Sequence, residues 1–223
     1  MQDFDVVIIG GGPGGINAGI MLSKAGKSVA MVQEETESFG GTCLNRGCMP
    51  TKSLLKAATA LRHAKEGGKY GLDLRVGPVD LKKVSAVTGA DLAMLRGAVG
   101  GMLDEAHVTT LRGKGSFESD RIIAVTRSDG SKQKLRGETI ILATGSTPRE
   151  LPSVPFDGKH ILSSDQMLAN TELPEKLLII GGGAIGCEFA TLYSTFGSEV
   201  IVVEAMESLL PREDPEAGKA LKA

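Results

Sequence analysis

The sequence predicts an α/β protein built around two similar strand–turn–helix–strand units. A short β-branched apolar run at residues 6–9 leads directly into a glycine-rich turn and then into a helical pattern. The same order recurs from residue 177. Glycine makes up 30 of the 223 residues, roughly twice average usage, without a collagen-like period. The glycine excess therefore belongs to specific turns, and those turns are where a site is expected.

Composition excludes several classes of protein. The chain has 25 Lys and Arg against 27 Asp and Glu, a net charge of −2, whereas a nucleic-acid binder would show a basic excess. Aromatic residues make up only 4% and Trp is absent, which argues against a base-stacking platform. No apolar run is long enough to span a membrane, and no signal-peptide pattern opens the sequence. We expect a cytoplasmic protein with reduced thiols and no nucleic-acid or membrane partner.

The first unit reads as a βαβ unit with a phosphate-binding turn. Residues 6–9 form a buried parallel strand, a helix spans about 13–25 and ends at Gly26, and a second strand spans 28–32. The turn carries G-x-G-x-x-G at Gly10, Gly12 and Gly15. These glycines allow a tight turn, close approach of a pyrophosphate, and close helix–strand packing. The alternative, a plain glycine-rich turn, is disfavoured by the flanking strand and helix.

A dinucleotide site is also expected to have an acidic residue at the end of the second strand, to hold a ribose hydroxyl. That strand ends in Val32, Gln33 and Glu34. Counting from the glycines places Gln33 at the ribose position, with Glu34 next. An amide can hydrogen-bond a hydroxyl, so the prediction of a dinucleotide site stands.

The second unit repeats this plan about 170 residues later. It comprises a strand at 177–180, a second G-x-G-x-x-G, a helix at 184–196 ended by Gly197, and a strand at 199–203. Two such units suggest two dinucleotides, a tightly held flavin and a diffusible nicotinamide. Glu204 closes the last strand, where a carboxylate accepts hydrogen bonds from the ribose of NAD and repels the 2′-phosphate of NADP. The alternative is a solvated strand-end Glu.

Two cysteines lie between the units, spaced C-x4-C at Cys43 and Cys48, ahead of a helix expected at about 54–65. Such a pair can close a small disulfide, and a helix start with the nearby Lys52 would stabilise a thiolate. A zinc site would need further ligands, and the three histidines are scattered, so no metal site is expected. A purely structural disulfide is the other alternative. The third cysteine, Cys187, reads as a buried small apolar residue.

The remaining segments complete the predicted order. A long helical pattern covers 79–106 and is interrupted by several glycines. Short strands follow at 121–126 and 132–135, joined by a hairpin at Asp129 and Gly130, and a strand at 139–143 returns to the first sheet. A proline-containing segment at 151–160 reads as the crossing to a second domain. We therefore expect domains at 1–150 and 151–223.

Four motifs in the same order as in a known family make a resemblance plain. They are DVVIIGGGPGG at 5–15, GGTCLNRGCMPTKSLL at 40–55, ILATGS at 141–146 and LPEKLLIIGGGAIGCEFA at 173–190. The chain resembles the class I pyridine nucleotide-disulfide oxidoreductases, and among them most closely the dihydrolipoyl dehydrogenases. The resemblance implies two Rossmann-like units: an FAD-binding domain with an antiparallel β insertion and a redox-active disulfide, then the incomplete start of an NAD-binding domain.

The resemblance also implies residue roles. Cys48 would lie against the flavin as the charge-transfer thiolate, and Cys43 would be the interchange thiol that meets the substrate. Lys52 would lie near the flavin and pair with Glu188, which completes the catalytic set. The implied FAD-binding residues are Gly10, Gly12, Gly14, Gly15, Gln33, Glu34, Gly41, Thr42, Lys52, Gly115, Ala143, Thr144, Gly145 and Ser146. The implied NAD-binding residues are Gly181, Gly183, Ala184, Ile185, Gly186, Glu188 and Glu204.

The implied reaction moves electrons from a small-molecule or lipoyl dithiol through Cys43 and Cys48 and FAD to NAD. Implied partners are a second copy in a homodimer and a 2-oxoacid dehydrogenase complex. Family members are about twice this length, so we expect this chain alone to lack the rest of the second domain and the interface domain, and to be inactive. The alternatives are an NADPH-dependent enzyme like glutathione or mercuric reductase, and a non-catalytic flavin-binding fragment.

Overall fold

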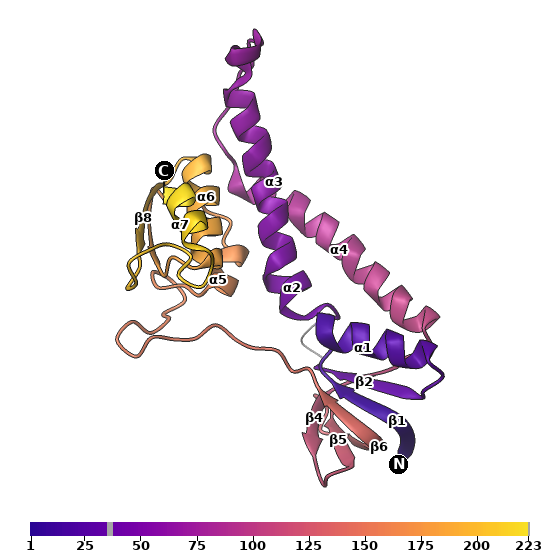
Figure 1. Cartoon of the computed structure of the whole chain (residues 1–223). Helices are drawn as coiled ribbons and strands as arrows, with labels where there is room; N and C mark the ends of the chain where they lie inside the picture. Colours follow the sequence, from indigo (N-terminus) through magenta and orange to yellow (C-terminus); the bar gives the residue numbers. More distant parts are fainter. Residues whose placement is uncertain (35–37, 223) are drawn as a thin grey trace. The chain divides into compact units, whose positions relative to one another are not determined.

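The computed structural model describes residues 1–34 and 38–222 (Figure 1). The chain divides into two compact units, and each is described by itself. The first unit contains Met1–Met49 and Ala90–Leu151, and the second contains Pro50–Gly89 and Pro152–Ala223. The predicted domains at 1–150 and 151–223 stay a prediction.

The first unit contains a mixed sheet. Its strands lie in the order β3-β2-β1-β6-β5-β4 among the described residues. The pairs β3–β2, β2–β1 and β1–β6 are parallel, whereas the pairs β6–β5 and β5–β4 are antiparallel. This is the predicted α/β architecture with an antiparallel insertion. The strands are β1 Gln2–Ile9, β2 Val29–Gln33, β3 Thr109–Arg112, β4 Lys114–Phe117, β5 Ile122–Thr126 and β6 Lys132–Leu142.

Strand β6 corrects the prediction of two separate strands at 132–135 and 139–143. It runs without a break from Lys132 to Leu142 and pairs antiparallel with β5 and parallel with β1. The polar residues 136–138 suggested a loop from sequence. The strand continues through them because residue 137 is a glycine. A Cβ at this position would lie only 2.9 Å from a methyl carbon of Val7. One strand therefore joins the parallel and antiparallel parts of the sheet.

Both faces of the parallel part are covered. Val6 and Ile8 of β1 pack in one cluster with Ile16 of α1 (Pro13–Lys24) and Leu103 of α4 (Leu81–Glu105), and Figure 1 shows α1 beside β1 and β2. The alternating Val7 and Ile9 pack in a second cluster with residues of β3, β5 and β6. Burial on both faces explains why the strand reads as a continuous apolar run.

The second unit holds a smaller parallel pair with one helix packed on it. The strands β7 (Lys176–Ile180) and β8 (Glu199–Val203) flank α6 (Ala184–Phe196), so these elements are confirmed to within a residue. Buried side chains of α6 pack with residues of α3 (Cys48–Lys65) and α5 (Ser164–Ala169). Elements of this unit that the sequence analysis did not predict are a 3-10 helix at Gly67–Tyr70, α5, and α7 at Pro215–Lys222.

The helix near the cysteines starts earlier than predicted. Helix α2 covers Gly41–Arg46, and α3 begins at Cys48 rather than near residue 54. The glycines and Pro50 in this stretch suggested a loop, but proline is well tolerated in the first turn of a helix. The long helix at 79–106 is confirmed as α4, and its interior glycines do not interrupt it.

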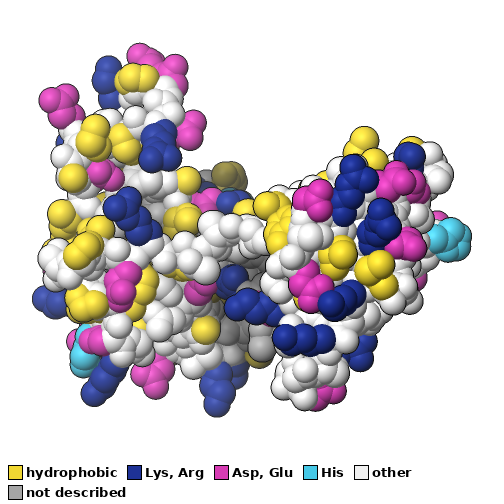
Figure 2. Space-filling view, turned by 90° about the horizontal axis from the view of Figure 1, so that it is seen from below, with side chains coloured by type: hydrophobic (Ala, Val, Ile, Leu, Met, Phe, Trp, Pro, Cys, Tyr) yellow, Lys and Arg dark blue, Asp and Glu magenta, His cyan; other side chains and the backbone are white. Residues whose placement is uncertain are grey.

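On the face drawn in Figure 2, acidic and basic side chains are interspersed. Within the described ranges, none of the helices combines the length and apolar character needed to cross a bilayer.

Candidate functional site

A cavity of about 670 Å³ opens in the first unit at the carboxyl end of β1. Five segments line it: the glycine turn, the end of β2, the β3–β4 junction, the end of β6, and the cysteine segment. Parallel sheets commonly bind ligands at this edge. The predicted residues that line it are Gly10, Gly12, Gly14, Gln33, Glu34, Gly41, Thr42, Cys43, Cys48, Gly115, Ala143, Thr144, Gly145 and Ser146.

The sequence analysis missed several lining residues, and two predicted FAD-binding residues, Gly15 and Lys52, are absent from the lining. The additional residues are Ile9, Gly11, Pro13, Val32, Arg46, Gly113 and Lys114. Most are immediate neighbours in sequence of predicted positions, and this proximity is the only feature of the sequence that could have identified them. Gly15 is not among the lining residues, because it serves packing: a Cβ there would lie 2.0 Å from the carbonyl oxygen of Gly10.

The glycines of the first turn are of two kinds. Some lie where a side chain would clash with the backbone, and others border open space. Gly10 has φ +110°, and a Cβ on it would lie 2.2 Å from the Ala143 carbonyl oxygen. At Gly12 the nearest described atom to a Cβ would be Gly41 Cα at 3.7 Å, and none lies within 4 Å at Gly14. Gly12 caps α1 without a side-chain hydrogen bond, so the helix start presents backbone N–H groups. This cradle fits the pyrophosphate of a dinucleotide.

Gln33 is held against the turn. Its side chain is 5% exposed, and its Oε1 accepts a hydrogen bond from the Gly11 N–H at 2.5 Å. That contact fixes the amide and leaves its NH₂ group as a donor. A ribose hydroxyl can accept such a hydrogen bond, so Gln33 fits the predicted ribose position. Glu34, the next residue, is exposed.

The two cysteines belong to consecutive helices that border the same cavity. Cys43 lies on α2 and is half-buried, while Cys48 is the exposed first residue of α3. Gly47 separates the helices; a Cβ on it would approach the Thr42 carbonyl oxygen to 2.9 Å. The disulfide and the roles of the two sulfurs stay predictions.

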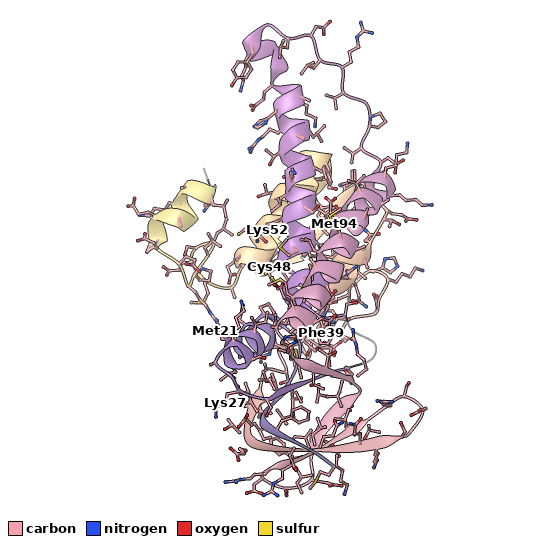
Figure 3. The ribbon with its side chains drawn as sticks, turned by 90° about the vertical axis from the view of Figure 1, so that its right-hand side faces the viewer. Met21, Lys27, Phe39, Cys48, Lys52 and Met94 are labelled. Atoms are coloured by element: carbon pink, nitrogen blue, oxygen red, sulfur yellow. The ribbon has the colours of Figure 1, made fainter. Side chains whose placement is uncertain are left out.

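Lys52 and Glu188 are brought together within the second unit. Lys52 lies on α3, one turn after Cys48 (Figure 3), and its Nζ donates to Glu188 Oε1 of α6. The side chains are 58% and 29% exposed, so solvent screens the pair and it contributes little to stability. The pairing implied by the family resemblance is therefore present, whereas the catalytic roles stay predictions.

The second glycine turn has the geometry of the first. Gly181 has φ +111°, and a Cβ on Gly186 would lie 2.0 Å from the Gly181 carbonyl oxygen. Gly183 caps α6 without a side-chain hydrogen bond, and Ala184 and Ile185 form the first helical turn. This turn therefore also presents backbone N–H groups at a helix start, as a nucleotide phosphate requires.

Glu204 is bonded to the backbone of this turn. Its Oε2 accepts from the Gly182 N–H at 2.7 Å, and its Oε1 accepts from the Met206 N–H at 3.0 Å. The backbone hydrogen bonds from Met206 and Gly182 hold the pKa of the carboxyl below its ordinary value. A charged carboxylate thus stands where an NAD ribose is predicted. Its contact with a nucleotide stays a prediction.

Cys187 lies behind the same turn. Its thiol is buried and donates to the Gly182 carbonyl oxygen at 3.3 Å. Burial, and then the nearby Glu204 charge, raise the pKa of the thiol. Both effects disfavour the reactive thiolate, as expected for a small buried residue.

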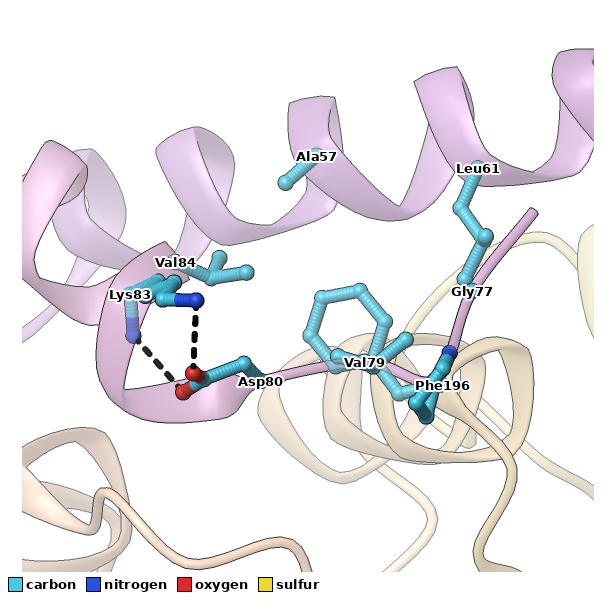
Figure 4. A pocket seen from close by; sticks show the side chains of 9 residues that line it. Ala57, Leu61, Gly77, Val79, Asp80, Lys83, Val84 and Phe196 are labelled. Atoms are coloured by element: carbon cyan, nitrogen blue, oxygen red, sulfur yellow. Dashed lines mark hydrogen bonds and ion pairs between the residues drawn. The ribbon is translucent and has the colours of Figure 1, made fainter.

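A second, smaller cavity lies within the second unit (Figure 4). Its volume is about 360 Å³, and mainly apolar side chains from α3, α6 and the start of α4 line it. The Asp80–Lys83 ion pair at its edge joins residues of a single helix turn. Among the described residues, no group of three or more His, Cys, Asp or Glu is arranged to hold a metal ion.

Fold and site together define an α/β dinucleotide-binding protein that carries a cysteine pair in its first nucleotide cleft. The chain belongs to the pyridine nucleotide-disulphide oxidoreductase family, whose sequence model matches residues 4–223.

Known relatives agree with this assignment. The chain is 39% identical over 221 residues to a dihydrolipoyl dehydrogenase of Chlorobaculum parvum and 36% identical over 216 residues to one of Bacillus subtilis, covering 98% and 96% of this chain. It covers 46% of each of those proteins, so it spans about half their length.

Solved structures also match. LpdA from Mycobacterium tuberculosis superimposes with a TM-score of 0.88 at 26% identity over 99% of this chain and 48% of that one. The Cu(II) complex of the HOCl-induced flavoprotein disulfide reductase RclA from Escherichia coli gives a TM-score of 0.80 at 29% identity, over 99% and 46% of the two chains.

Proposed function

We propose that this chain forms the FAD-binding and dithiol part of a disulfide oxidoreductase of the dihydrolipoyl dehydrogenase type. In this proposal Cys43 and Cys48 carry electrons from a dithiol substrate to FAD, and the second unit binds NAD. The observation that supports it best is the single cavity lined by both cysteines and by an uncapped, glycine-rich helix start. A cleft of this kind can hold a dinucleotide next to a thiol pair.

The proposed chemistry at the cysteines is a thiol–disulfide exchange. One substrate thiolate attacks Cys43 Sγ of a Cys43–Cys48 disulfide, and Cys48 leaves as a thiolate. The second substrate thiol then displaces Cys43, so the substrate becomes a disulfide and the protein gains two electrons. Bound FAD supplies a two-electron acceptor for this dithiol. Cys48 is the first residue of α3 and borders the same cavity as the glycine turn.

The substrate, partners and location in this proposal rest on relatives that are about twice as long as this chain. A lipoyl dithiol substrate, membership of a 2-oxoacid dehydrogenase complex, a homodimer and a cytoplasmic location are proposed for a protein of the full length of those relatives. Glu204 supports NAD rather than NADP, which disfavours a reductase of the glutathione or mercuric type. The Lys52–Glu188 pair is proposed to hold Lys52 for its role near the flavin.

FAD titration of this chain tests the flavin part of the proposal. Gly12→Val adds a side chain into the open part of the cradle, where only Gly41 Cα is near. It should weaken FAD binding at least tenfold while leaving the far-ultraviolet circular dichroism unchanged. Gly89→Ala, on α4 where a Cβ meets no described atom within 4 Å, is the matched control. Affinity follows from quenching of flavin fluorescence.

We expect this chain to bind FAD weakly, and a version with the full length of its relatives to bind it tightly enough to purify yellow. Failure of the unaltered chain to bind FAD at millimolar concentration would contradict the proposal, as would equal binding by Gly12→Val. Stoichiometric FAD on the purified 223-residue chain would overturn only the expectation of weak binding.

A further inference from the structure

Asn45, between the two cysteines, has its side-chain amide fully engaged. Its Nδ2 donates to the carbonyl oxygens of Ser38 and Gly41, each at 3.0 Å. Its Oδ1 accepts from Arg96 Nε at 2.7 Å. An amide with both its N–H groups and its oxygen bonded has one orientation, so the middle of the C-x4-C segment is tied to its beginning.

Arg96 reaches this amide from a helix remote in sequence. It lies on α4, 51 residues after Asn45, and is half-buried in the first unit. A charged donor makes a stronger hydrogen bond than a neutral one. Arg96 therefore ties Asn45 to a helix remote from its own segment.

The segment held by Asn45 in turn packs on the phosphate-binding turn. The Gly40 N–H donates to the Gly11 carbonyl oxygen at 2.7 Å. Gly41 lies so close to that turn that a Cβ on it would be 2.7 Å from Gly12 Cα. A continuous set of contacts thus runs from Arg96 through Asn45 and Gly41 to the glycine turn.

We propose that Arg96 is a positioning residue that acts through Asn45 to pre-organise the Cys43–Cys48 pair for disulfide formation. The inference rests on the proposed function, because it requires these two thiols to form a reversible disulfide. By restricting the segment that carries both sulfurs, the Arg96–Asn45 contact raises their effective concentration towards each other. Neither residue exchanges electrons or touches the substrate in this proposal.

The expected effect is moderate. Losing one charged hydrogen bond from a half-buried network frees the segment without unfolding it. The equilibrium constant for forming the disulfide should fall about threefold to tenfold in Arg96→Met. For a two-electron couple, tenfold corresponds to about 30 mV, so the reduction potential should rise by up to that amount.

Trypsin digestion provides a readout that needs neither flavin nor activity. The chain is equilibrated with mixtures of dithiothreitol and its cyclic disulfide, in which two electrons and two protons pass between that couple and the protein. Thiols are then trapped by alkylation. Cleavage after Arg46 places Cys43 on peptide 28–46 and Cys48 on peptide 47–52, so only the disulfide form yields a linked pair. Cys187 falls on a separate peptide, 177–212.

Four variants and one control separate positioning from general destabilisation. Arg96→Met should raise the potential, and Arg96→Lys, which keeps a charged donor, should recover part of the shift. Asn45→Ala should raise the potential on its own, and adding Arg96→Met to it should change little further, because the contact is already lost. Lys82→Met, at an exposed position on the same helix, is the control and should leave the potential unchanged.

The outcomes distinguish this inference from the proposed function. If no linked peptide forms in the unaltered chain, the dithiol chemistry itself fails. If the disulfide forms but Arg96→Met leaves its potential unchanged, or if the Arg96 and Asn45 effects add fully, the positioning role is overturned. A lowered melting temperature with an unchanged potential would show that Arg96 is only structural.

Discussion

The Glu204 carboxylate accepts a hydrogen bond from the Gly182 N–H at 2.7 Å. In the first unit, Gln33 accepts from the Gly11 N–H in the corresponding place, at 2.5 Å. In both units a side chain at the carboxyl end of the second strand, Gln33 as the last residue of β2 and Glu204 directly after β8, therefore fixes the second of three consecutive glycines in the turn. A group predicted only to meet a ribose also shapes the cradle for the phosphates, so its substitution has two consequences.

Glu204 should set the choice of nicotinamide. Glu204→Ala should weaken NADH binding by about tenfold to a hundredfold, the range expected for a lost charged hydrogen bond. It should also reduce the difference in affinity between NADH and NADPH. Glu204→Gln keeps an acceptor for the Gly182 N–H but removes the charge. It should therefore reduce the difference in affinity between NADH and NADPH with less loss of NADH affinity. The dissociation constants follow from NADH and NADPH fluorescence at fixed ionic strength. Glu199→Ala on the same strand is the control. An unchanged NADH-to-NADPH ratio in Glu204→Ala would remove the main support for NAD.

The same carboxyl should make local stability depend on pH. Backbone hydrogen bonds hold the pKa of Glu204 below its ordinary value, so its stabilisation is complete above the unfolded pKa of about 4.3 and is lost as pH falls through the folded pKa. The difference in melting temperature between the unaltered chain and Glu204→Ala should therefore be constant near neutral pH and shrink in acid. A difference that grows in acid would contradict this reading.

The cysteine variants should differ in their spectra. In a version of full family length reconstituted with FAD, Cys43→Ser should leave Cys48 as a permanent thiolate with a long-wavelength absorbance band but without disulfide exchange. Cys48→Ser should lack that band after two-electron reduction. Cys187→Ser, remote in sequence from the pair, should behave as the unaltered protein. Opposite behaviour of the first two variants would reverse the roles proposed for the two sulfurs.

The Lys52–Glu188 pair should matter little for stability. With side chains 58% and 29% exposed, its loss in Lys52→Met should change the free energy of unfolding by less than about 1 kcal/mol. Chemical denaturation measures this, and Lys176→Met, which breaks the exposed pair with Glu199, should give a similarly small change. A much larger loss in Lys52→Met would show that the pair supports the fold rather than a site.

A lysine should be tolerated on one face of the β7–β8 pair and should destabilise the protein on the other. One face presents Leu178, Ile180, Ile201 and Val203, each 49–59% exposed, while Leu177 on the other packs in the core with α6. Exposed apolar patches bind hydrophobic dyes. Leu178→Lys should lower anilinonaphthalene sulfonate fluorescence with little change in stability. Leu177→Lys should cost more, on the order of 1–3 kcal/mol, because it places a charge on the partly buried face that packs with α6. Equal effects from these neighbouring residues would contradict the assigned faces.

The sequence by itself predicted the local elements with a strong pattern. The helices at 13–25 and 184–196 and the strands beside them were predicted closely, because apolar periodicity and glycine turns are short-range signals. The same signals placed the nucleotide turns, and the C-x4-C spacing identified the cysteine pair. The early start of α3 and the unbroken course of β6 escaped prediction, since glycine, proline and polar residues suggest loops when their neighbours in space are unknown.

Only the tertiary structure decided which of these residues meet. Lys52 and Glu188 are 136 residues apart, and Arg96 and Asn45 are 51 apart, so no local pattern links them. Glu204 appeared from sequence as a strand end facing a ribose, and folding also made it an acceptor for the Gly182 N–H. Secondary structure follows from interactions within a few residues, whereas a site is assembled by packing that brings distant segments within hydrogen-bonding distance.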